Sequence, residues 1–527
     1  MRLHQMNAAG QSSSDARSTV VSSSANSTNP FAYHKALAQE HHKKLGGSVF
    51  QVARRYFELV WLQLNCQQIP TDSGHPLRHA KTIHERHEGT SDSMGFEEVF
   101  RPLSFALDAA ALRKGVLSFA QDHPKLAIGG SALLAYTLLC RALRYQRMRR
   151  MRSKYSYRTW DDMAQMTNEE AYEIQKELMQ REFPFTMNKA LQFALFRTYG
   201  IPTISKLLVQ TKQLSDVRYA PRRYTDTEVL IQDFIGNAPQ SERANGAIAR
   251  MNYLHSLYRN SGKISNDDLL YTLALFALEP KNWVNRYEWR KLSELEICAI
   301  GTFWKSIGDA MEISYEALPG SKNGWKNGIQ WFEEVEEWST AYEKQCMVPH
   351  PDNKKTADET TAMLLYDAPK SLHPAGFKVV SALMDDRLRK AMMYPEPPAG
   401  LITAIDVAFK IRAFLLRHFA LPRPSFMRHQ KMSDEPNKDG RYHQLEYDVD
   451  PWYVEASFSN RWALRSWFKW MVGKPYPGSP GFKAEGYVLE EVGPKSLEGK
   501  GMEYFVQTKE RLMNQSRGGC PFAITKA

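Results

Sequence analysis

The 527-residue sequence predicts an all-α fold, with one large helical domain behind an N-terminal membrane anchor. After Thr159, apolar residues recur with the period of a helix in nearly the whole chain, and the alternation typical of β-strands is scarce. Before that point, the fifteen residues Leu126–Cys140 carry no charge, and a dense group of cations follows them.

Several helices have clear starting signals. Thr167–Glu170 and Ser293–Glu296 have the spacing of a capping box, in which the first side chain and the fourth cap each other's backbone amides. Ser265–Asp268 is a related start, with a carboxylate three residues after the capping serine. Pro239 near the start and Gly262 past the end frame a further helix over 241–259.

The first 120 residues differ in composition from the rest. Residues 1–30 are rich in Ser, Asn and Thr, lack an apolar run, and are predicted to be disordered rather than a cleavable signal peptide. Residues 31–120 form a variable N-terminal extension of short amphipathic stretches and polar loops. Four histidines between His75 and His87 fit either solvated surface positions or a metal site.

Residues 121–143 are predicted to be the membrane anchor. Leu126–Cys140 alone would span roughly 22 Å as a helix, less than the roughly 30 Å hydrocarbon core of a bilayer. Extension to Leu143, with long cations at both ends reaching the headgroups, lengthens it to about 27 Å. The alternative is a buried core helix followed by a solvated basic helix.

The positive charge of the chain is concentrated in one place. Eight Lys and Arg residues and no acid lie in the segment from Arg141 to Arg158. This segment therefore supplies +8 of the formal net charge of +11 of the whole chain. The flank 144–158 therefore resembles the cytosolic side of a membrane span, and it places the C-terminal bulk in the cytosol. Because the remainder is nearly balanced, no nucleic-acid partner is expected.

The five cysteines are far apart and form no Cys-x-x-Cys pair, so neither a disulfide framework nor a structural zinc site is indicated, and a reducing compartment fits. The absence of Cys-x-x-Cys-His also excludes covalent haem attachment of the c type. The helical domain is expected to cover residues 160–510, followed by a loose tail over 511–527.

His255 is the histidine best placed for chemistry. Residues at helical spacing from it, such as Ile248 and Met251, are apolar, so its ring belongs to the inward face of its helix. Arg223 and Thr227 lie upstream, four residues apart and therefore on one face of a helical turn. A cation and a hydroxyl that point together into a site could bind a propionate or orient dioxygen. An ordinary helix start and a core histidine remain the alternatives.

Five long segments give the chain a family resemblance. They are EFPFTMNKALQFALFRTYGIPTISKLL (182–208), RYTDTEVLI (223–231), ARMNYLHSLYR (249–259), SNDDLLYTLALFALEP (265–280) and AIGTFWKSIGDAMEISYE (299–316). With the Gly-Gly-Cys-Pro-Phe sequence at 518–522, they resemble the catalytic domain shared by fungal mycophenolic acid B (MpaB) type oxygenases and bacterial latex-clearing proteins. The resemblance extends from about Trp160 to the C-terminus and is closest to the fungal branch.

The resemblance implies a cofactor and a set of site residues. The latex-clearing branch holds haem b through one histidine, which His255 matches, and has an upstream Arg-x-x-x-Thr element that Arg223 and Thr227 match. His255 is therefore the expected metal ligand, with Arg223 as a further haem-binding residue. Arg223, Thr227 and Asp226 are the expected catalytic residues, although Asp226 stands where the latex branch has lysine. The catalytic base stays unassigned.

The resemblance also implies a function. The fungal relatives are endoplasmic-reticulum (ER) enzymes that oxidatively cleave a prenyl chain, so the expected partners are a lipophilic prenylated substrate, dioxygen and ER membrane lipid. An isolated alkene offers no acidic proton or polar bond, which is why activated dioxygen is required. Apolar helices over 188–200, 266–278 and 294–318 are expected to wall a cavity near the haem. A non-catalytic helical membrane protein that binds haem or assists assembly is the alternative.

Other candidate sites are less well supported by the sequence. His350 and Asp352 have the spacing of two facial-triad iron ligands, but they lie in a Pro- and Lys-rich loop. Cys520 in Gly-Gly-Cys-Pro resembles a thiolate haem ligand, but it is seven residues from the C-terminus and lacks the surrounding loop of such a site. His418 is either a structural or a second functional histidine. Arg461–Trp470 mixes aromatic and cationic residues and could contact headgroups or pack as an amphipathic helix.

Overall fold

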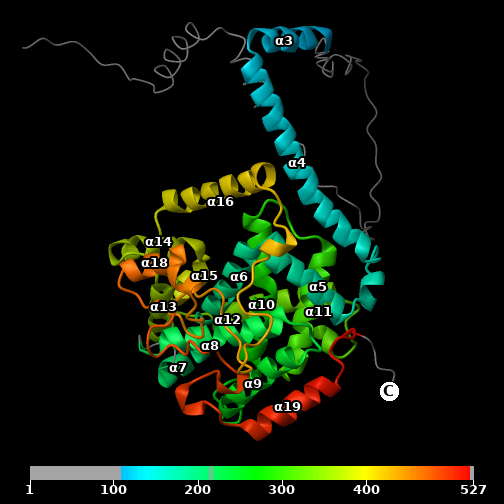
Figure 1. The fold of residues 1–527 in the computed structure, drawn as a ribbon. Coiled ribbons are helices and arrows are strands. Elements are labelled where there is room, and N and C mark those ends of the chain that lie inside the picture. Colours follow the sequence, from blue (N-terminus) through cyan, green and yellow to red (C-terminus); the bar gives the residue numbers. More distant parts are fainter. Residues whose placement is uncertain (1–108, 213, 215, 217, 523–527) are drawn as a thin grey trace, which may run out of the picture. The chain divides into compact units, whose positions relative to one another are not determined.

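The computed structural model describes residues 109–212, 214, 216 and 218–522. Within this part of the chain all regular structure is helical, apart from isolated β-bridges such as Tyr442 with Tyr487 (Figure 1). The predicted all-α class is therefore confirmed. The histidines between His75 and His87, and most of the N-terminal extension, lie outside the described residues.

The first half of the chain supplies eight α-helices of the described part. They are α3 (Ala109–Asp122), α4 (Pro124–Lys154), α5 (Asn168–Glu177), α6 (Pro184–Thr198), α7 (Pro202–Thr211), α8 (Ala220–Gly236), α9 (Glu242–Arg259) and α10 (Asn266–Tyr287). The second half supplies α11 (Glu294–Ala310), α12 (Gly328–Cys346), α13 (Pro351–Leu364), α14 (His373–Leu383), α15 (Asp386–Ala391), α16 (Ala399–Phe419), α17 (Phe458–Trp462), α18 (Leu464–Met471) and α19 (Met502–Asn514). Short 3-10 and π turns connect several of them.

The predicted helix starts are found where the sequence places them. Thr167 and Glu170 form a complete capping box at the start of α5, as do Ser293 and Glu296 at the start of α11. The Ser265 hydroxyl accepts the Asp268 amide at the start of α10. These local signals are confirmed because each depends only on residues within one turn of the helix.

Helix α10 lies at the centre of the helical body, between α6, α11 and α12 (Figure 1). Fifteen of its residues are buried, on all of its sides. A helix that is apolar all round needs neighbours all round. Helices α6, α11 and α12 provide these neighbours.

Helices α11 and α12 approach each other through two glycines. A Cβ atom on Gly301 would lie 2.1 Å from the Gly328 carbonyl oxygen, and one on Gly328 would lie 2.3 Å from the Cys298 oxygen. No side chain fits at either position without moving backbone. The two backbones are therefore held closer than ordinary side-chain packing allows.

A buried group of charges joins four helices. The Arg197 guanidinium of α6 donates to both carboxylate oxygens of Glu343 on α12, at 2.7 and 2.8 Å. It also pairs with Asp385, which caps α15, and lies 3.8 Å from Glu279 of α10. Burial raises the pKa of Glu279 to about 7, although Arg197 opposes that shift.

This raised pKa predicts how stability depends on pH. Between the ordinary glutamate pKa near 4.5 and the folded value near 7, the folded protein holds a proton that the unfolded chain releases, so stability falls as pH rises through this window. In Glu279→Gln the fall between about pH 5 and pH 8 should be smaller by roughly 1–3 kcal/mol. Denaturant unfolding at several pH values measures it, with Glu316→Gln at an exposed position as control. An unchanged pH slope in Glu279→Gln would contradict the prediction.

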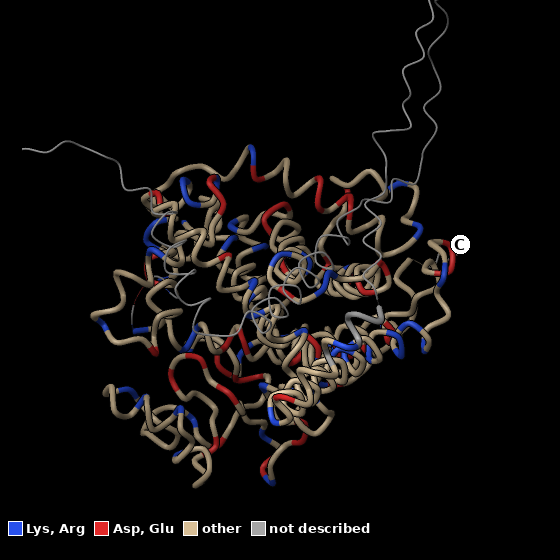
Figure 2. Tube along the Cα trace, turned by 90° about the horizontal axis from the view of Figure 1, so that it is seen from above, with Lys and Arg blue, Asp and Glu red and all other residues tan. Residues whose placement is uncertain are grey.

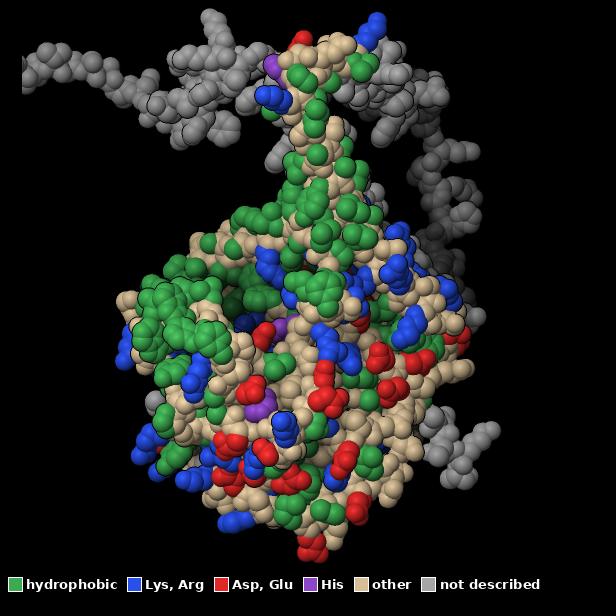
Figure 3. Space-filling model, viewed as in Figure 1, with side chains coloured by type: hydrophobic (Ala, Val, Ile, Leu, Met, Phe, Trp, Pro, Cys, Tyr) green, Lys and Arg blue, Asp and Glu red, His purple; other side chains and the backbone are tan. Residues whose placement is uncertain are grey.

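Helix α4 is a single unbroken helix that contains both the predicted anchor and the predicted basic flank. By length and composition it could cross a membrane, and only 6% of its most apolar window is buried (Figure 3). Its second half packs on the body, where Cys140 and Arg144 are buried and Arg147 donates to Glu182 at 3.0 Å. The limit predicted between residues 143 and 144 falls within this one helix, and part of the basic flank is docked on the body.

Charges of both signs are interspersed over the helical body when it is seen from above (Figure 2). Many of the cations are engaged in ion pairs within the chain, among them Arg290 with Glu296 at 2.8 Å and Arg441 with Glu491 at 2.9 Å. These cations are thus balanced locally by acids of the same chain.

The expected loose tail over 511–527 is packed as far as Phe522, which corrects that prediction. The carbonyl oxygens of Gly518 and Gly519 accept the amides of the first residues of α5, and the Asn168 side chain donates to the Arg517 carbonyl at 2.7 Å. The C-terminal segment therefore satisfies amides that a helix N-terminus leaves free. Residues 523–527 lie outside the described part.

Candidate active site

Helices α6 to α11 enclose a cavity of about 190 Å³. The three apolar helical segments predicted to wall a cavity all contribute to it, so this part of the prediction is confirmed, and α7, α8 and α9 complete the wall. Most lining residues are apolar, including Leu195, Leu207, Ile231, Phe276, Trp304 and Ile307. Such a lining excludes water and favours an apolar ligand.

His255 faces this cavity from α9. Among the described residues, neither ring nitrogen has a hydrogen-bond partner, and the ring is half-buried. Burial lowers the pKa of His255 to about 4, and the nearby Arg223 and Arg259 lower it further. The imidazole is therefore neutral at physiological pH, with a free lone pair for a metal.

Arg223 and Thr227 reach the same cavity from α8. The Thr227 hydroxyl donates to the Arg223 carbonyl oxygen at 2.8 Å, so its own oxygen remains available as an acceptor. The Arg223 guanidinium has no hydrogen bond or ion pair within the described residues. Its neighbour Arg222 differs, since it pairs with Glu498 at 3.0 Å away from the cavity. The structure thus brings Arg223, Thr227 and His255 together.

Asp226 is not brought to the cavity. Its carboxylate accepts the Tyr453 hydroxyl at 2.8 Å and lies 3.7 Å from the Arg222 guanidinium. Burial raises the pKa of Asp226 to about 6, and Arg222 opposes the shift. Because successive helical residues point in different directions, Asp226 lies on the side of α8 that contacts the C-terminal part of the chain.

A smaller pocket of about 40 Å³ adjoins the cavity and shares Thr227 and Phe276 with it. At this pocket Lys431 pairs with Glu228, and the same lysine lies 2.9 Å from Asp448. This charged group is not among the sites predicted from the sequence. Glu228 directly follows Thr227, but Lys431 is distant in sequence, and no local pattern connects the two.

The other candidate residues have structural surroundings. His350 caps α13, where its Nδ1 accepts the Asp352 amide at 3.1 Å. The His418 ring lies against Phe414 at 4.8 Å on α16. The Cys520 sulfur lies 3.3 Å from the Ala164 carbonyl oxygen. None of the three lines the cavity.

Within the described residues no group of three or more His, Cys, Asp or Glu side chains is placed to hold a metal ion. A bare metal ion in a catalytic site usually takes about three protein ligands. The single imidazole of His255 therefore fits a metal that brings its remaining ligands with it.

Comparison with known proteins gives close relatives. The chain is 48% identical to the ER-bound oxygenase mpaB' of Penicillium brevicompactum over 392 residues, which covers 74% of this chain and 93% of the relative. It is 46% identical to the ER-bound oxygenase mpaB of the same organism, over 67% of this chain and 83% of the relative. Identity reaches 55% with the ER-bound oxygenase mpaB of Penicillium roqueforti (strain FM164), over 50% of this chain and 89% of the relative. No family model matches the chain.

The extent of these alignments confirms the resemblance seen in the helical segments, since each covers more than four fifths of the relative at an identity well above 30%. The cavity with His255, Arg223 and Thr227 lies inside the helical body. The chain is an oxygenase, and it belongs to the family of ER-bound MpaB-type oxygenases.

Proposed function

We propose that this oxygenase binds haem b through His255 and uses dioxygen to cleave a carbon–carbon double bond in a lipophilic, prenylated molecule. The observation that supports this best is the pairing of a neutral, unpartnered imidazole with an unpaired guanidinium on one apolar cavity. Haem supplies four nitrogen ligands of its own, so one protein imidazole suffices. Its anionic propionates suit a cation such as Arg223.

The size of the cavity adds one requirement. Pockets for drug-sized ligands measure roughly 300–1,000 Å³, whereas this cavity measures about 190 Å³. Haem binding must therefore displace lining side chains. Met251 and Leu207 both line the cavity, and their side chains are apolar, so they can change rotamer without breaking a hydrogen bond. Methionine is unbranched and adapts its shape especially easily.

In the proposed reaction the haem and the protein have different roles. Bound haem would supply the activation of dioxygen that an isolated alkene requires. The apolar side chains of α6, α10 and α11 bind the prenyl chain and keep water away from it. His255 would hold the metal and Arg223 would hold a propionate, while the Thr227 oxygen, which faces the same cavity, can accept a hydrogen bond.

An absorption spectrum of the purified full-length chain, combined with an aerobic assay, tests the proposal. We expect a Soret band, and with a prenylated substrate we expect oxygen consumption with an aldehyde, ketone or acid as product. A Soret band without oxygen consumption would favour the non-catalytic haem-binding alternative. Cleavage by protein that lacks haem would refute the proposed cofactor.

Affinity for substrate should rise with the length of the prenyl chain. Burial of apolar surface contributes about 25 cal/mol per Å², before the cost of ordering the chain. Each added isoprene unit should therefore lower the Kd by a few-fold until the cavity is filled. Titration with a series of prenylated analogues, which differ only in chain length, measures this. Equal Kd values along the series would contradict an apolar prenyl site.

We also propose that α4 crosses the ER membrane once and leaves the helical body in the cytosol. The relatives are named ER-bound, α4 is long and apolar enough to span, and the cations between Arg141 and Arg158 follow its uncharged run. Such cations stay on the cytosolic side. Microsomes should retain the chain after alkaline carbonate washing, and added protease should digest the body. Release by carbonate, or protection of the body, would refute this topology.

A further inference from the structure

Helix α16 turns its charged residues toward the protein and its apolar residues outward. On the inner side Arg412 donates to Glu288 at 3.0 Å, Asp406 pairs with Arg286 at 3.2 Å, and the Phe409 ring lies against the Tyr287 ring with centroids 4.3 Å apart. None of its 21 residues is fully buried. The exposed positions are Ala399, Gly400, Ile402, Thr403, Ala404, Val407, Ala408, Lys410, Ile411, Phe414, Leu415 and Phe419. Lys410 is the one charge among them, which inverts the usual pattern of a helix on a protein surface.

Helices α17 and α18 repeat this inverted pattern. In α18 the polar Ser466 and Lys469 are the buried residues, and the Lys469 ammonium donates to the Val449 carbonyl oxygen at 2.8 Å. Besides the exposed Arg461 and Arg465, the outward side chains are large and apolar, with exposed fractions from 41% to 79%: Phe458, Trp462, Leu464, Trp467, Phe468, Trp470 and Met471. A solvated helix of this composition would place its aromatic residues inward instead.

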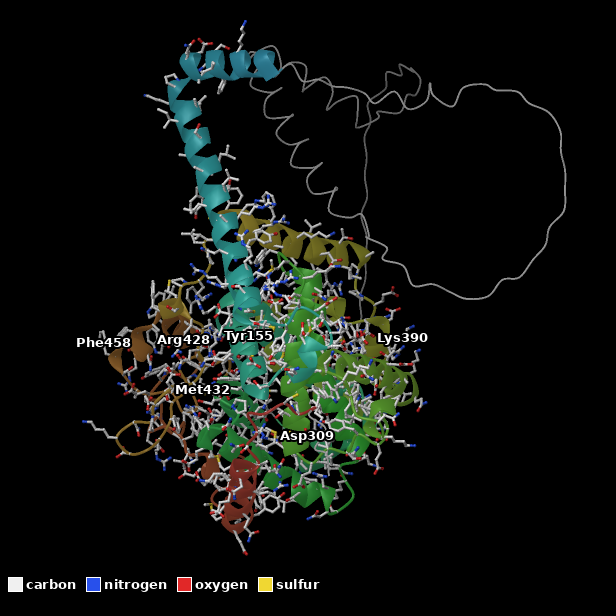
Figure 4. All side chains as sticks on the ribbon, turned by 90° about the vertical axis from the view of Figure 1, so that its right-hand side faces the viewer. Tyr155, Asp309, Lys390, Arg428, Met432 and Phe458 are labelled. Atoms are coloured by element: carbon white, nitrogen blue, oxygen red, sulfur yellow. The ribbon has the colours of Figure 1, made fainter. Side chains whose placement is uncertain are left out.

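Both surfaces lie on the side of the body toward which α4 projects. The Tyr136 hydroxyl of α4 donates to the Phe419 carbonyl oxygen at 2.9 Å, and Arg144 donates to the Ala420 oxygen at 3.0 Å. The end of α16 is therefore level with the end of the uncharged run of α4. In Figures 1 and 4, α4 leans toward the side that carries α17 and α18, where Phe458 is labelled, and Figure 3 shows their apolar residues as one patch.

We propose that the exposed faces of α16, α17 and α18, called here the outer apolar surface, lie in the headgroup region of the membrane that α4 crosses. The proposal rests on the proposed membrane crossing, because it is α4 that fixes which side of the body faces lipid. At the level where a span leaves the hydrocarbon core, tryptophan side chains and amphipathic helices parallel to the membrane are stable. Lys410 can extend to the headgroups from an otherwise apolar face. The body is thus in contact with lipid through three helices besides its anchor.

The tryptophans of the outer apolar surface allow a test that leaves the surface apolar. Full-length protein would be reconstituted into phosphatidylcholine vesicles with or without brominated acyl chains, and its tryptophan fluorescence compared. The variant Trp462→Phe/Trp467→Phe/Trp470→Phe should lose most of the quenching by brominated lipid. The matched control is Trp160→Phe, because Trp160 is 44% exposed but lies outside the outer apolar surface. That control should keep the wild-type quenching.

Each outcome separates this proposal from the membrane crossing. Equal quenching of the triple variant and the wild type would overturn the proposal, provided that the protein still floats with the vesicles. Protein that does not float would refute the crossing by α4 and, with it, this proposal. Aqueous iodide serves as the reciprocal probe and should reach Trp160 but not the three surface tryptophans. If those three are shielded from both iodide and brominated lipid, another protein surface covers them, and the proposal is wrong.

Discussion

Replacement of His255 by Ala should remove most of the haem from the purified protein and lower alkene cleavage by on the order of 100-fold or more. Among the described residues that line the cavity, His255 is the one histidine. Alanine favours helix, so α9 should persist. The measurements are haem stoichiometry, turnover and the far-UV circular dichroism spectrum.

Two matched pairs make this test specific. His418→Ala removes a histidine of α16, outside the cavity, and should leave the Soret band in place. Arg223→Ala should weaken haem retention, whereas Arg222→Ala, one residue earlier and paired with Glu498, should not. Free imidazole added to His255→Ala should restore part of the bound haem. Full haem content in His255→Ala, or loss only in His418→Ala, would overturn the assignment.

Arg250→Met should destabilise the protein by about 3–5 kcal/mol. Arg250 is completely buried on α9, and its guanidinium donates to the carbonyl oxygens of Val492, Leu497 and Lys500, each at 2.8 Å. Methionine fills a similar volume but leaves the buried Val492 oxygen and the part-buried Leu497 and Lys500 oxygens without their donor. A buried acceptor without a donor costs roughly 1–3 kcal/mol, and the buried guanidinium is lost as well. Denaturant unfolding of the full-length protein in detergent measures the loss.

The same helix provides the control. Arg259→Met, at the half-buried end of α9, removes longer bonds to the carbonyl oxygens of Met311 and Glu312 and should cost about 1 kcal/mol or less. Because Arg250 ties α9 to the segment 492–500, its loss should also lower haem content through displacement of His255. Similar unfolding free energies for the two variants would show that the buried bonds contribute little.

The sequence predicts those features of this fold that depend on neighbouring residues. The capping boxes of α5 and α11 and the bounds of α9 follow from residues within a few positions, and the inward face of His255 follows from helical spacing. The meeting of His255 with Arg223 and Thr227 depends on how α8 packs on α9, and it was expected from the family resemblance rather than from spacing.

Features that depend on distant residues were missed. Lys431 reaches Glu228 across about two hundred positions, and Gly518 and Gly519 cap a helix that begins at Asn168. The orientation of α18 was left open, because an amphipathic pattern shows which side is apolar but not whether that side meets protein or lipid. In the structure Lys469 is buried, so the polar side of α18 faces the protein and the apolar side faces outward.

The continuity of α4 has a mechanical consequence. A flexible linker between anchor and enzyme would let the enzyme tumble above the bilayer at a variable height. Helix α4 instead passes without a break from its exposed apolar half into the packed body, where Cys140 and Arg144 hold it. Its 31 residues form a strut about 46 Å long. If this strut crosses the membrane as proposed, it would hold the body and its cavity at one height above the bilayer.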